Sequence, residues 1–212
     1  MNSIAGKGHN IAGNALCDNG VMIDFSTMRK VRVDAPKKRA YVEPGATLAD
    51  FDESAQSRGL ATPVGINSTT GIAGLTLGGG SGWLTCKCGM TVDNLISVEV
   101  VTADGKRIRG SENENADLFW AIRGGGGNFA IVTQFEFKLH EIGPEILGGL
   151  IVYPFDQAKQ VLTQYREFVK TAPEELNVWA VIRKAPPLPF LPEDAHGTEV
   201  VLFGIFYIGD AD

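Results

Sequence analysis

The sequence predicts an α+β fold, in which an antiparallel-rich sheet is flanked by helices. Apolar and polar residues alternate with a period of two, most clearly over 131–139, which is typical of a strand with one buried face. Separate helical patterns lie between such runs, at 47–58 and 116–122. The dipeptide Asp104-Gly105 joins two strand-like runs, which is typical of a hairpin and therefore of antiparallel pairing.

The first elements along the chain are short strands, expected at 21–25, 31–33 and 40–42. The helix at 47–58 follows them. Thr47 and Asp50 have the spacing of a capping box, because the hydroxyl and the carboxylate three residues apart can each accept a backbone N–H. Gly59 stands where the helix would end, since glycine readily adopts the left-handed conformation of a helix terminus.

Strands are next expected at 95–101 and 106–109, and after helix 116–122 comes the strand 131–139. The pattern changes after Gly143-Pro144, where a strand at 149–153, a helix at 156–170 and strands at 178–182 and 199–207 follow. The proline-rich segment 185–192 is expected to be a loop or an extended edge. We therefore predict two domains, residues 1–142 and residues 143–212.

The composition is that of a globular protein, since 212 residues with 44% hydrophobic and 21% charged content can bury a core. A net charge of -6 without long runs of like charge argues against nucleic acid or an anionic membrane surface as partner. No apolar stretch approaches the roughly 20 residues that cross a bilayer, and the first residues lack the features of a signal peptide. We expect a cytoplasmic protein.

Cysteine and histidine do not suggest a metal site or a disulfide framework. The three cysteines, Cys17, Cys86 and Cys88, are an odd number, and the last two are too close together for a zinc ribbon. The three histidines, His9, His140 and His196, lie far apart in the sequence and show no metal-binding helical spacing. No metal is predicted.

Glycine is clustered in two runs, Gly78 to Gly80 with Gly82, and Gly124 to Gly127. Neither run fits a Rossmann loop, because the second follows a helix and precedes a strand, and neither ends in the Gly-Lys-Ser/Thr of a P-loop. Two interpretations of the glycine runs remain. The runs form tight turns and close packing contacts, or they bring backbone N–H groups against a long ligand.

Several motifs together resemble the berberine-bridge-enzyme-like FAD-linked oxidases, which are of the vanillyl-alcohol-oxidase type and carry a PCMH-type FAD-binding domain. The matching segments, in the family's order, are Gly8 to Gly13, Val21 to Asp24, Pro44 to Thr47, Gly71 to Gly82, Asp93-Asn94 and Asp117 to Phe129. The resemblance runs from Gly8 to about Leu139. It implies that residues 1–142 are an FAD-binding domain without most of its amino-terminal lobe, and that residues 143–212 begin a substrate-binding domain.

The resemblance also implies a set of cofactor-binding residues. His9 matches the histidine that the family bonds covalently to the 8α-methyl carbon of the flavin; the alternative is an exposed histidine near the chain terminus. The other implied contacts are Gly6, Lys7, Gly8, Asn10, Gly65, Asn67, Ser68, Thr69, Gly71, Gly74, Gly78, Gly79, Gly82, Asn128, Ile131 and Val132. Backbone atoms are expected to dominate these contacts.

The sequence departs from the family pattern at two of these places. Lys7 stands in a loop where the family has glycine, and the arginine that usually precedes that loop is absent. Asn67 occupies the place of the cysteine that makes a second covalent link in some members, and an amide cannot form a thioether. We therefore expect a single link, through His9. The Asp93-Asn94 pair is interpreted as a turn or helix cap, and no catalytic base is assigned.

The implied activity is removal of a hydride from a C–H bond of a small alcohol, sugar or amine, with FAD as the acceptor and oxygen as the final oxidant. A second interpretation is a truncated fragment that keeps the fold without stoichiometric flavin, because family members are about twice as long; by itself the chain is then expected to be inactive. Neither the substrate nor the oligomeric state follows from the sequence, and a homodimer stays open.

Overall fold

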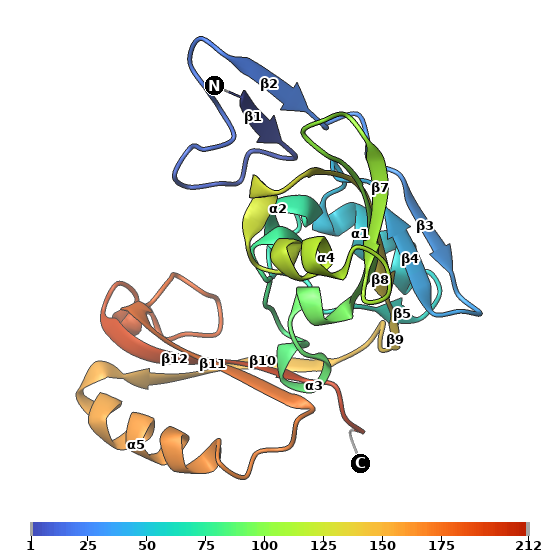
Figure 1. Ribbon diagram of the computed structural model, residues 1–212. Coiled ribbons are helices and arrows are strands. Elements are labelled where there is room, and N and C mark those ends of the chain that lie inside the picture. Colours follow the sequence, from blue (N-terminus) through green and yellow to red (C-terminus); the bar gives the residue numbers. More distant parts are fainter. Residues whose placement is uncertain (1, 211–212) are drawn as a thin grey trace. The chain divides into compact units, whose positions relative to one another are not determined.

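The computed structural model describes residues 2–210 and divides into two compact units after Pro144. Both units combine antiparallel sheets with a few helices, so the predicted α+β class is confirmed (Figure 1). The assignment of the two units as a flavin-binding and a substrate-binding domain stays a prediction. None of the helices within residues 2–210 is both long and apolar enough to cross a membrane.

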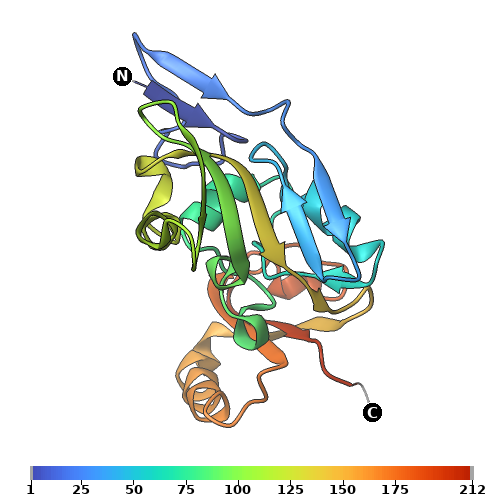
Figure 2. The ribbon, with the colours of Figure 1, turned by 45° about the vertical axis from the view of Figure 1, so that its right-hand side comes forward.

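The first unit is built on a five-stranded antiparallel sheet, seen in Figure 2. Its strands, in spatial order, are β3 (Val31–Asp34), β4 (Arg39–Val42), β8 (Ile131–Lys138), β6 (Leu95–Val101) and β7 (Arg107–Ser111). The hairpin between β6 and β7 turns at Gly105, whose φ of 79° is the left-handed conformation predicted for this position. The long strand β8 lies in the centre and joins the two hairpins.

Helices cover one face of this sheet and enclose the core. They are α1 (Leu48–Gln56), α2 (Ile72–Leu77) and α4 (Ala116–Ile122), with 3-10 turns at Thr91–Asn94 and Gly126–Asn128. A further short helix, α3 (Thr85–Cys88), contributes no buried residue. The core contains Phe51 of α1, Phe119 of α4, and Phe135 and Phe137 of β8, all nearly inaccessible to water. The rings of Phe51 and Phe137 lie 5.3 Å apart, so helix and sheet are joined by direct aromatic packing.

Two small strand pairs complete the first unit. β1 (Asn2–Ala5) pairs in parallel with β2 (Val21–Asp24), and β5 (Leu60–Ala61) pairs with β9 (His140–Glu141). The sequence pattern predicted β2 but not β1, β5 or β9. These strands have two to four residues, too few to show a period, and they exist because another segment lies beside them.

Helix α1 begins as the sequence predicted. The Thr47 hydroxyl accepts the backbone N–H of Asp50, and the Asp50 carboxylate accepts the backbone N–H of Thr47 at 2.7 Å. Arg29 donates to both oxygens of the same carboxylate. Burial opposes ionisation of Asp50, but the hydrogen bonds from Arg29 and Thr47 outweigh it and lower its pKa to about 2. The helix ends at Gln56, and Gly59 lies in the turn that follows, with φ of 65°.

The alternation predicted over 131–139 is interrupted within β8. The register against β6 shifts between Glu99 and Val100, so that Thr133 is an extra residue. As a result Val132, and not Ile131 or Thr133, is buried on the same side as Phe135 and Phe137. Strict alternation would place Ile131 on the side of Phe135 and Phe137, and the β-bulge reverses the facing of the residues before it.

The other face of the sheet carries a cluster of charges around Glu136, a residue only 6% exposed. Its carboxylate pairs with Arg39 and Arg109 and accepts hydrogen bonds from Ser97 and Tyr41. Burial opposes ionisation, yet the hydrogen bonds from Ser97 and Arg39 keep the pKa of Glu136 below its ordinary value. The central strand is thereby linked to β4, β6 and β7 by side chains as well as by backbone.

The second unit has a three-stranded antiparallel sheet with β12 (Glu199–Tyr207) between β10 (Leu147–Pro154) and β11 (Leu176–Lys184). Helix α5 (Ala158–Phe168), preceded by a 3-10 turn at Phe155–Gln157, packs on one face through Val161, which meets Val201 and Phe203. Residues 185–198 form the expected loop, which contains a 3-10 turn at Glu193–Ala195. All three strands and the helix were predicted.

One prediction concerns Gly45, at the turn between β4 and α1. A β-carbon there would lie 1.7 Å from the carbonyl oxygen of Phe25 and 2.8 Å from that of Met28. Because backbone atoms cannot move aside, we expect Gly45→Ala to lower the free energy of unfolding by about 3 kcal/mol. Gly127→Ala, where nothing lies within 4 Å, is the control. Equal urea midpoints for the two variants would contradict the close approach.

A second prediction concerns the pH dependence of Glu136. Its pKa is lower in the folded than in the unfolded state, so its contribution is complete above the unfolded pKa and is lost as the pH falls through the folded one. Glu136→Gln should therefore cost about 2 kcal/mol at pH 7. The difference should shrink below about pH 4. Glu141→Gln, which alters an exposed pair with Lys38, should show little effect at either pH in denaturant titrations.

Candidate functional site

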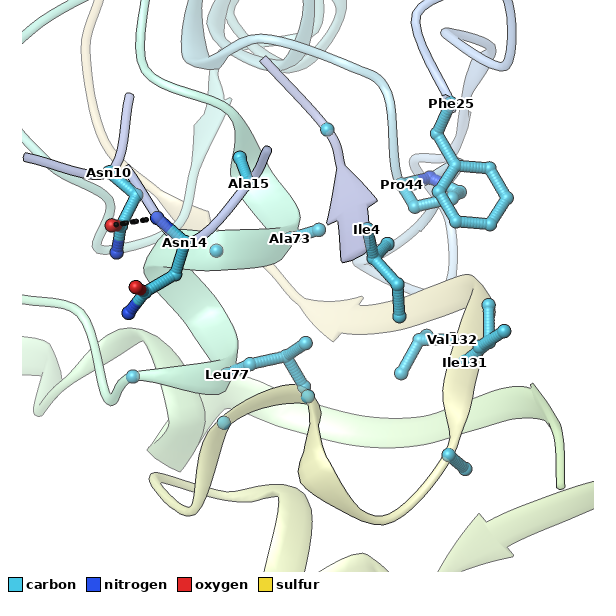
Figure 3. A pocket seen from close by; sticks show the side chains of 16 residues that line it. Ile4, Asn10, Asn14, Ala15, Phe25, Pro44, Ala73, Leu77, Ile131 and Val132 are labelled. Atoms are coloured by element: carbon cyan, nitrogen blue, oxygen red, sulfur yellow. Dashed lines mark hydrogen bonds between the residues drawn. The ribbon is translucent and has the colours of Figure 1, made fainter. Parts of the chain in front are cut away.

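Two neighbouring cavities lie in the first unit, with volumes of about 420 and 440 Å³. They share five lining residues, which are Ile4, Gly6, Asn10, Ala15 and Gly74. Figure 3 shows the first cavity, with Leu77 of α2 on one side, Ile131 and Val132 of β8 on another, and Ile4 of β1 above them. Together the cavities form one extended site of the size that holds a large ligand.

The loop from Gly6 to Asn10 forms a wall of both cavities. It lies close to the amino-terminal end of α2, because a β-carbon on Gly71 would come within 3.1 Å of the Lys7 side chain. Gly6 likewise lies against the carbonyl oxygen of Pro44. Gly8 has φ of 66°, which side-chain-bearing residues rarely adopt. The glycines of this loop are therefore required for its path as well as for access by a ligand.

The turn at Asn10 is held by its own side chain. The Asn10 carboxamide oxygen accepts the backbone N–H of Asn14 at 3.1 Å, drawn as a dashed line in Figure 3. The backbone carbonyl of Asn10 accepts the N–H of Gly13 at 3.1 Å. Ile11, within this turn, is fully exposed although it lines the second cavity. The turn thus presents apolar surface to the open site.

The segment beneath this loop is fixed by the start of α1. The N–H groups of Leu48 and Ala49 have no partner within their own helix, and they donate to the carbonyls of Thr70 and Ser68 at 2.9 and 3.0 Å. The N–H of Ile72 donates to Ala46 at 3.0 Å. These hydrogen bonds place the turn 67–70 and the start of α2 beside each other.

His9 lies at the second cavity and has one polar neighbour among residues 2–210. Its Nε2 atom is 3.4 Å from the Thr69 hydroxyl. That hydroxyl lies 2.7 Å from the carboxamide oxygen of Asn67, which also accepts the backbone N–H of Thr69 at 3.0 Å. The histidine is therefore held at its Nε2 side, by a turn that is itself fixed to α1.

The second glycine run lines the other end of the site. Gly126 and Gly127 face the first cavity, and the N–H of Gly124 donates to the carbonyl of Leu77 at 3.1 Å. Asn128 does not line either cavity; its amide donates to the carbonyl of Gly125 at 2.8 Å and closes the turn. The run is thus tied to α2, which borders both cavities.

Ten of the seventeen residues implied by the resemblance line one cavity or both. They are Gly6, Lys7, Gly8, His9, Asn10, Gly71, Gly74, Gly78, Ile131 and Val132. Segments far apart in the sequence are therefore brought together. Their contact with a cofactor stays a prediction.

The remaining seven, Gly65, Asn67, Ser68, Thr69, Gly79, Gly82 and Asn128, line neither cavity. The structure gives several of these a packing reason. A β-carbon on Gly82 would lie 1.9 Å from the carbonyl oxygen of Val64, and one on Gly79 would lie 2.9 Å from the Met90 side chain. Asn67, Ser68 and Thr69 form the turn beneath His9.

The structure adds residues that the sequence did not single out as contacts. Ile4, Asn14, Ala15, Phe25, Ala73, Leu77 and Ala130 line the first cavity. Most are apolar or small, and five of them, Ile4, Asn14, Ala15, Phe25 and Ala130, lie outside the segments quoted above for the family resemblance. Ala73 and Leu77 lie within those segments, as do Pro44 and the run Gly126-Gly127, which also line the cavity, so a signal was present for these.

The site fits an extended ligand such as FAD. Gly74 and Gly127 have nothing within 4 Å of the position of a β-carbon, so any side chain there would occupy open space. Lys7 is the one charged side chain that lines either cavity within the described residues, and its ammonium lies 3.5 Å from the carbonyl oxygen of Ser26. Glycine backbone, one cation and apolar side chains suit a flavin nucleotide, which has phosphates at its centre and a ring at one end.

Comparison with known proteins agrees with this chemistry. Residues 3–111 match the family described as "FAD binding domain". An FAD-linked oxidoreductase from Dictyostelium discoideum is 41% identical over 163 residues, which cover 76% of this chain and 36% of that protein.

Solved structures show the same fold. The crystal structure of 6-hydroxy-D-nicotine oxidase from Arthrobacter nicotinovorans superposes with a TM-score of 0.87 at 30% identity, covering 100% of this chain and 45% of the oxidase. A BBE-like protein from Arabidopsis thaliana gives 0.86 at 26% identity over 99% of this chain and 42% of its own. The chain thus spans about a third of its curated relatives. It belongs to the FAD-linked oxidoreductases with a PCMH-type FAD-binding domain.

Proposed function

We propose that this chain is part of an oxidoreductase that accepts a hydride from a small alcohol, sugar or amine onto FAD bonded covalently to His9, with oxygen as final acceptor. The observation that carries the proposal is the position of His9. It lines the second cavity next to the glycine loop, and its ring is exposed toward the site. Its Nε2 atom has a neighbour in Thr69, and no hydrogen bond of its Nδ1 atom is found within residues 2–210, so one ring nitrogen is available to a ligand.

The residues present divide the binding of the cofactor into two parts. The loop 6–10 and α2 offer backbone N–H groups and Lys7 to the phosphates. Ile131, Val132 and the second glycine run offer an apolar surface to the ring end. When bound, FAD supplies the hydride acceptor, and the protein contributes position and exclusion of water.

The kind of substrate is proposed from the relatives. A curated relative and a solved structure are named as 6-hydroxynicotine oxidases, and the solved pollen protein Phl p 4 is named a glucose dehydrogenase, with a variant of it named a glucose oxidase. Amines and sugars both carry a C–H bond beside nitrogen or oxygen, which supports the proposed substrate class. The naming of relatives as oxidases supports oxygen as acceptor. A cytoplasmic location and a homodimer stay predictions from the sequence.

The first test of this function is the covalent link. Protein expressed with FAD available should keep yellow flavin after acid precipitation, and digestion should give flavin mass on the peptide that contains His9. The peptide with Asn67 should carry none, because an amide does not form the thioether of doubly linked relatives. His9→Ala should lose all covalent flavin. Covalent flavin retained by this variant would refute the assignment.

The second test uses the shared wall of the two cavities. Gly74 faces open space within helix α2, so Gly74→Leu should leave the fold intact and fill the site. We expect at least a tenfold loss of FAD affinity, about 1.4 kcal/mol. The control is Ala49→Leu, which adds the same side chain at an exposed position of α1. Equal affinities by fluorescence titration, with both variants folded by circular dichroism, would place the ligand elsewhere.

A further inference from the structure

The turn beneath His9 contains a short chain of hydrogen bonds with a definite direction. The side-chain atom of Asn67 that faces Thr69 has two neighbours, the Thr69 N–H at 3.0 Å and the Thr69 hydroxyl at 2.7 Å. A backbone N–H can only donate, so this Asn67 atom must be the acceptor oxygen and not the amide nitrogen. The hydroxyl therefore donates its proton to the same oxygen.

The direction of this hydrogen bond determines whether the Thr69 hydroxyl oxygen donates to His9 or accepts from it. A threonine hydroxyl has one proton, and here it is already given to Asn67, so its oxygen can only accept from His9. The Nε2 atom of His9, 3.4 Å away, must then carry the proton. A neutral imidazole has a single N–H, so its other nitrogen, Nδ1, has a free lone pair.

We propose that Thr69 and Asn67 are positioning residues that hold His9 as the Nε2–H tautomer, so that Nδ1 is the nitrogen that bonds to the flavin. This inference rests on the proposed covalent role of His9. Neither positioning residue lines the cavities, so both act on the cofactor through the histidine. Nothing else among residues 2–210 makes a polar contact with the ring of His9.

The turn is rigid enough to impose this choice. The N–H of Thr70 donates to the carbonyl of Asn67 at 3.0 Å, and the carbonyls of Ser68 and Thr70 accept the first free N–H groups of α1. Thr69 lies between these anchored residues. Its hydroxyl is therefore held against His9 by backbone hydrogen bonds and does not depend on the cofactor for its position.

Bond formation needs the tautomer that the turn favours. His9 Nδ1 contributes its electron pair to a new bond with the 8α carbon, and one C–H bond of that methyl group breaks. The methyl proton, the Nε2 proton and two electrons leave in total, and dioxygen, the acceptor proposed above, takes them as hydrogen peroxide. With Nε2–H turned toward Thr69, that proton leaves from the side of the ring away from the new bond.

The tautomer can be measured without flavin. The chain labelled with ¹⁵N-histidine, at about pH 9 and so well above the ordinary pKa of an imidazole, gives separate shifts for protonated and free ring nitrogens. His9 is assigned by its absence in His9→Gln. We expect Nε2–H to dominate, and the ratio of Nε2–H to Nδ1–H to fall about fivefold in Thr69→Val, which lacks the hydroxyl. Thr69→Ser should match the wild type.

Substitutions of Asn67 give an independent test, because they should change the ratio of the two His9 tautomers through the Thr69 proton. Asn67→Leu leaves the Thr69 proton free to donate to Nε2, so the Nδ1–H form should increase beyond its level in Thr69→Val, whereas Asn67→Asp keeps the acceptor and the wild-type ratio. A wild type dominated by Nδ1–H, or a ratio unaffected by Thr69→Val in a folded protein, would overturn the inference.

Covalent flavin gives the second readout. After incubation with FAD, the histidyl-flavin peptide should be the Nδ1 isomer, and its rate of formation should fall several-fold in Thr69→Val and recover in Thr69→Ser. Attachment at Nε2 would overturn the inference while leaving the proposed function intact. If the wild type forms no covalent flavin, the proposed function fails, and the tautomer ratios still decide whether Thr69 and Asn67 set the state of His9.

Discussion

The hydrogen bonds between the start of α1 and the segment 68–72 are the constraint on which the site depends. Helix α1 packs its aromatic ring into the core of the first unit, so its position is set by the burial of apolar side chains. Its first N–H groups need acceptors, and the carbonyls of Ser68 and Thr70 supply them. The core therefore determines where the turn 67–70 and helix α2 lie, and these in turn position His9 and the loop beside it.

Glycine has two separate functions in this arrangement. Gly45 and Gly82 allow backbone segments to approach where a β-carbon would meet a carbonyl oxygen, and their neighbours belong to the fold. Gly74 and Gly127 face open space, and there the missing side chain leaves room for a ligand. Within the runs themselves, Gly82 is required by close packing, whereas Gly127 lines the first cavity and its contact with a ligand stays a prediction. Steric surroundings, and not glycine content, distinguish them.

The two faces of the five-stranded sheet carry different kinds of side chain. Helices and aromatic side chains cover one face, whereas the other carries Glu136 between Arg39 and Arg109. Strand β8 contributes to both faces and also to the first cavity, through Ile131 and Val132. The bulge at Thr133 makes this combination possible, because it turns Val132 to the side of Phe135 and Phe137, although strict alternation would place it on the opposite face.

The sequence by itself determined the fold class, the capped helix at Thr47, the hairpin at Gly105 and, through its resemblance to a family, the importance of His9 and the loop around it. Each of these features depends on residues close together in the sequence or on a family motif, so it can be predicted from a short segment. Tertiary structure alone decided which glycines face the cavity, where β8 changes its facing, and that Thr69 and Asn67 lie against His9. The contact between Thr69 and His9 joins residues 60 positions apart, and such contacts arise only when the packed core brings distant backbone segments together.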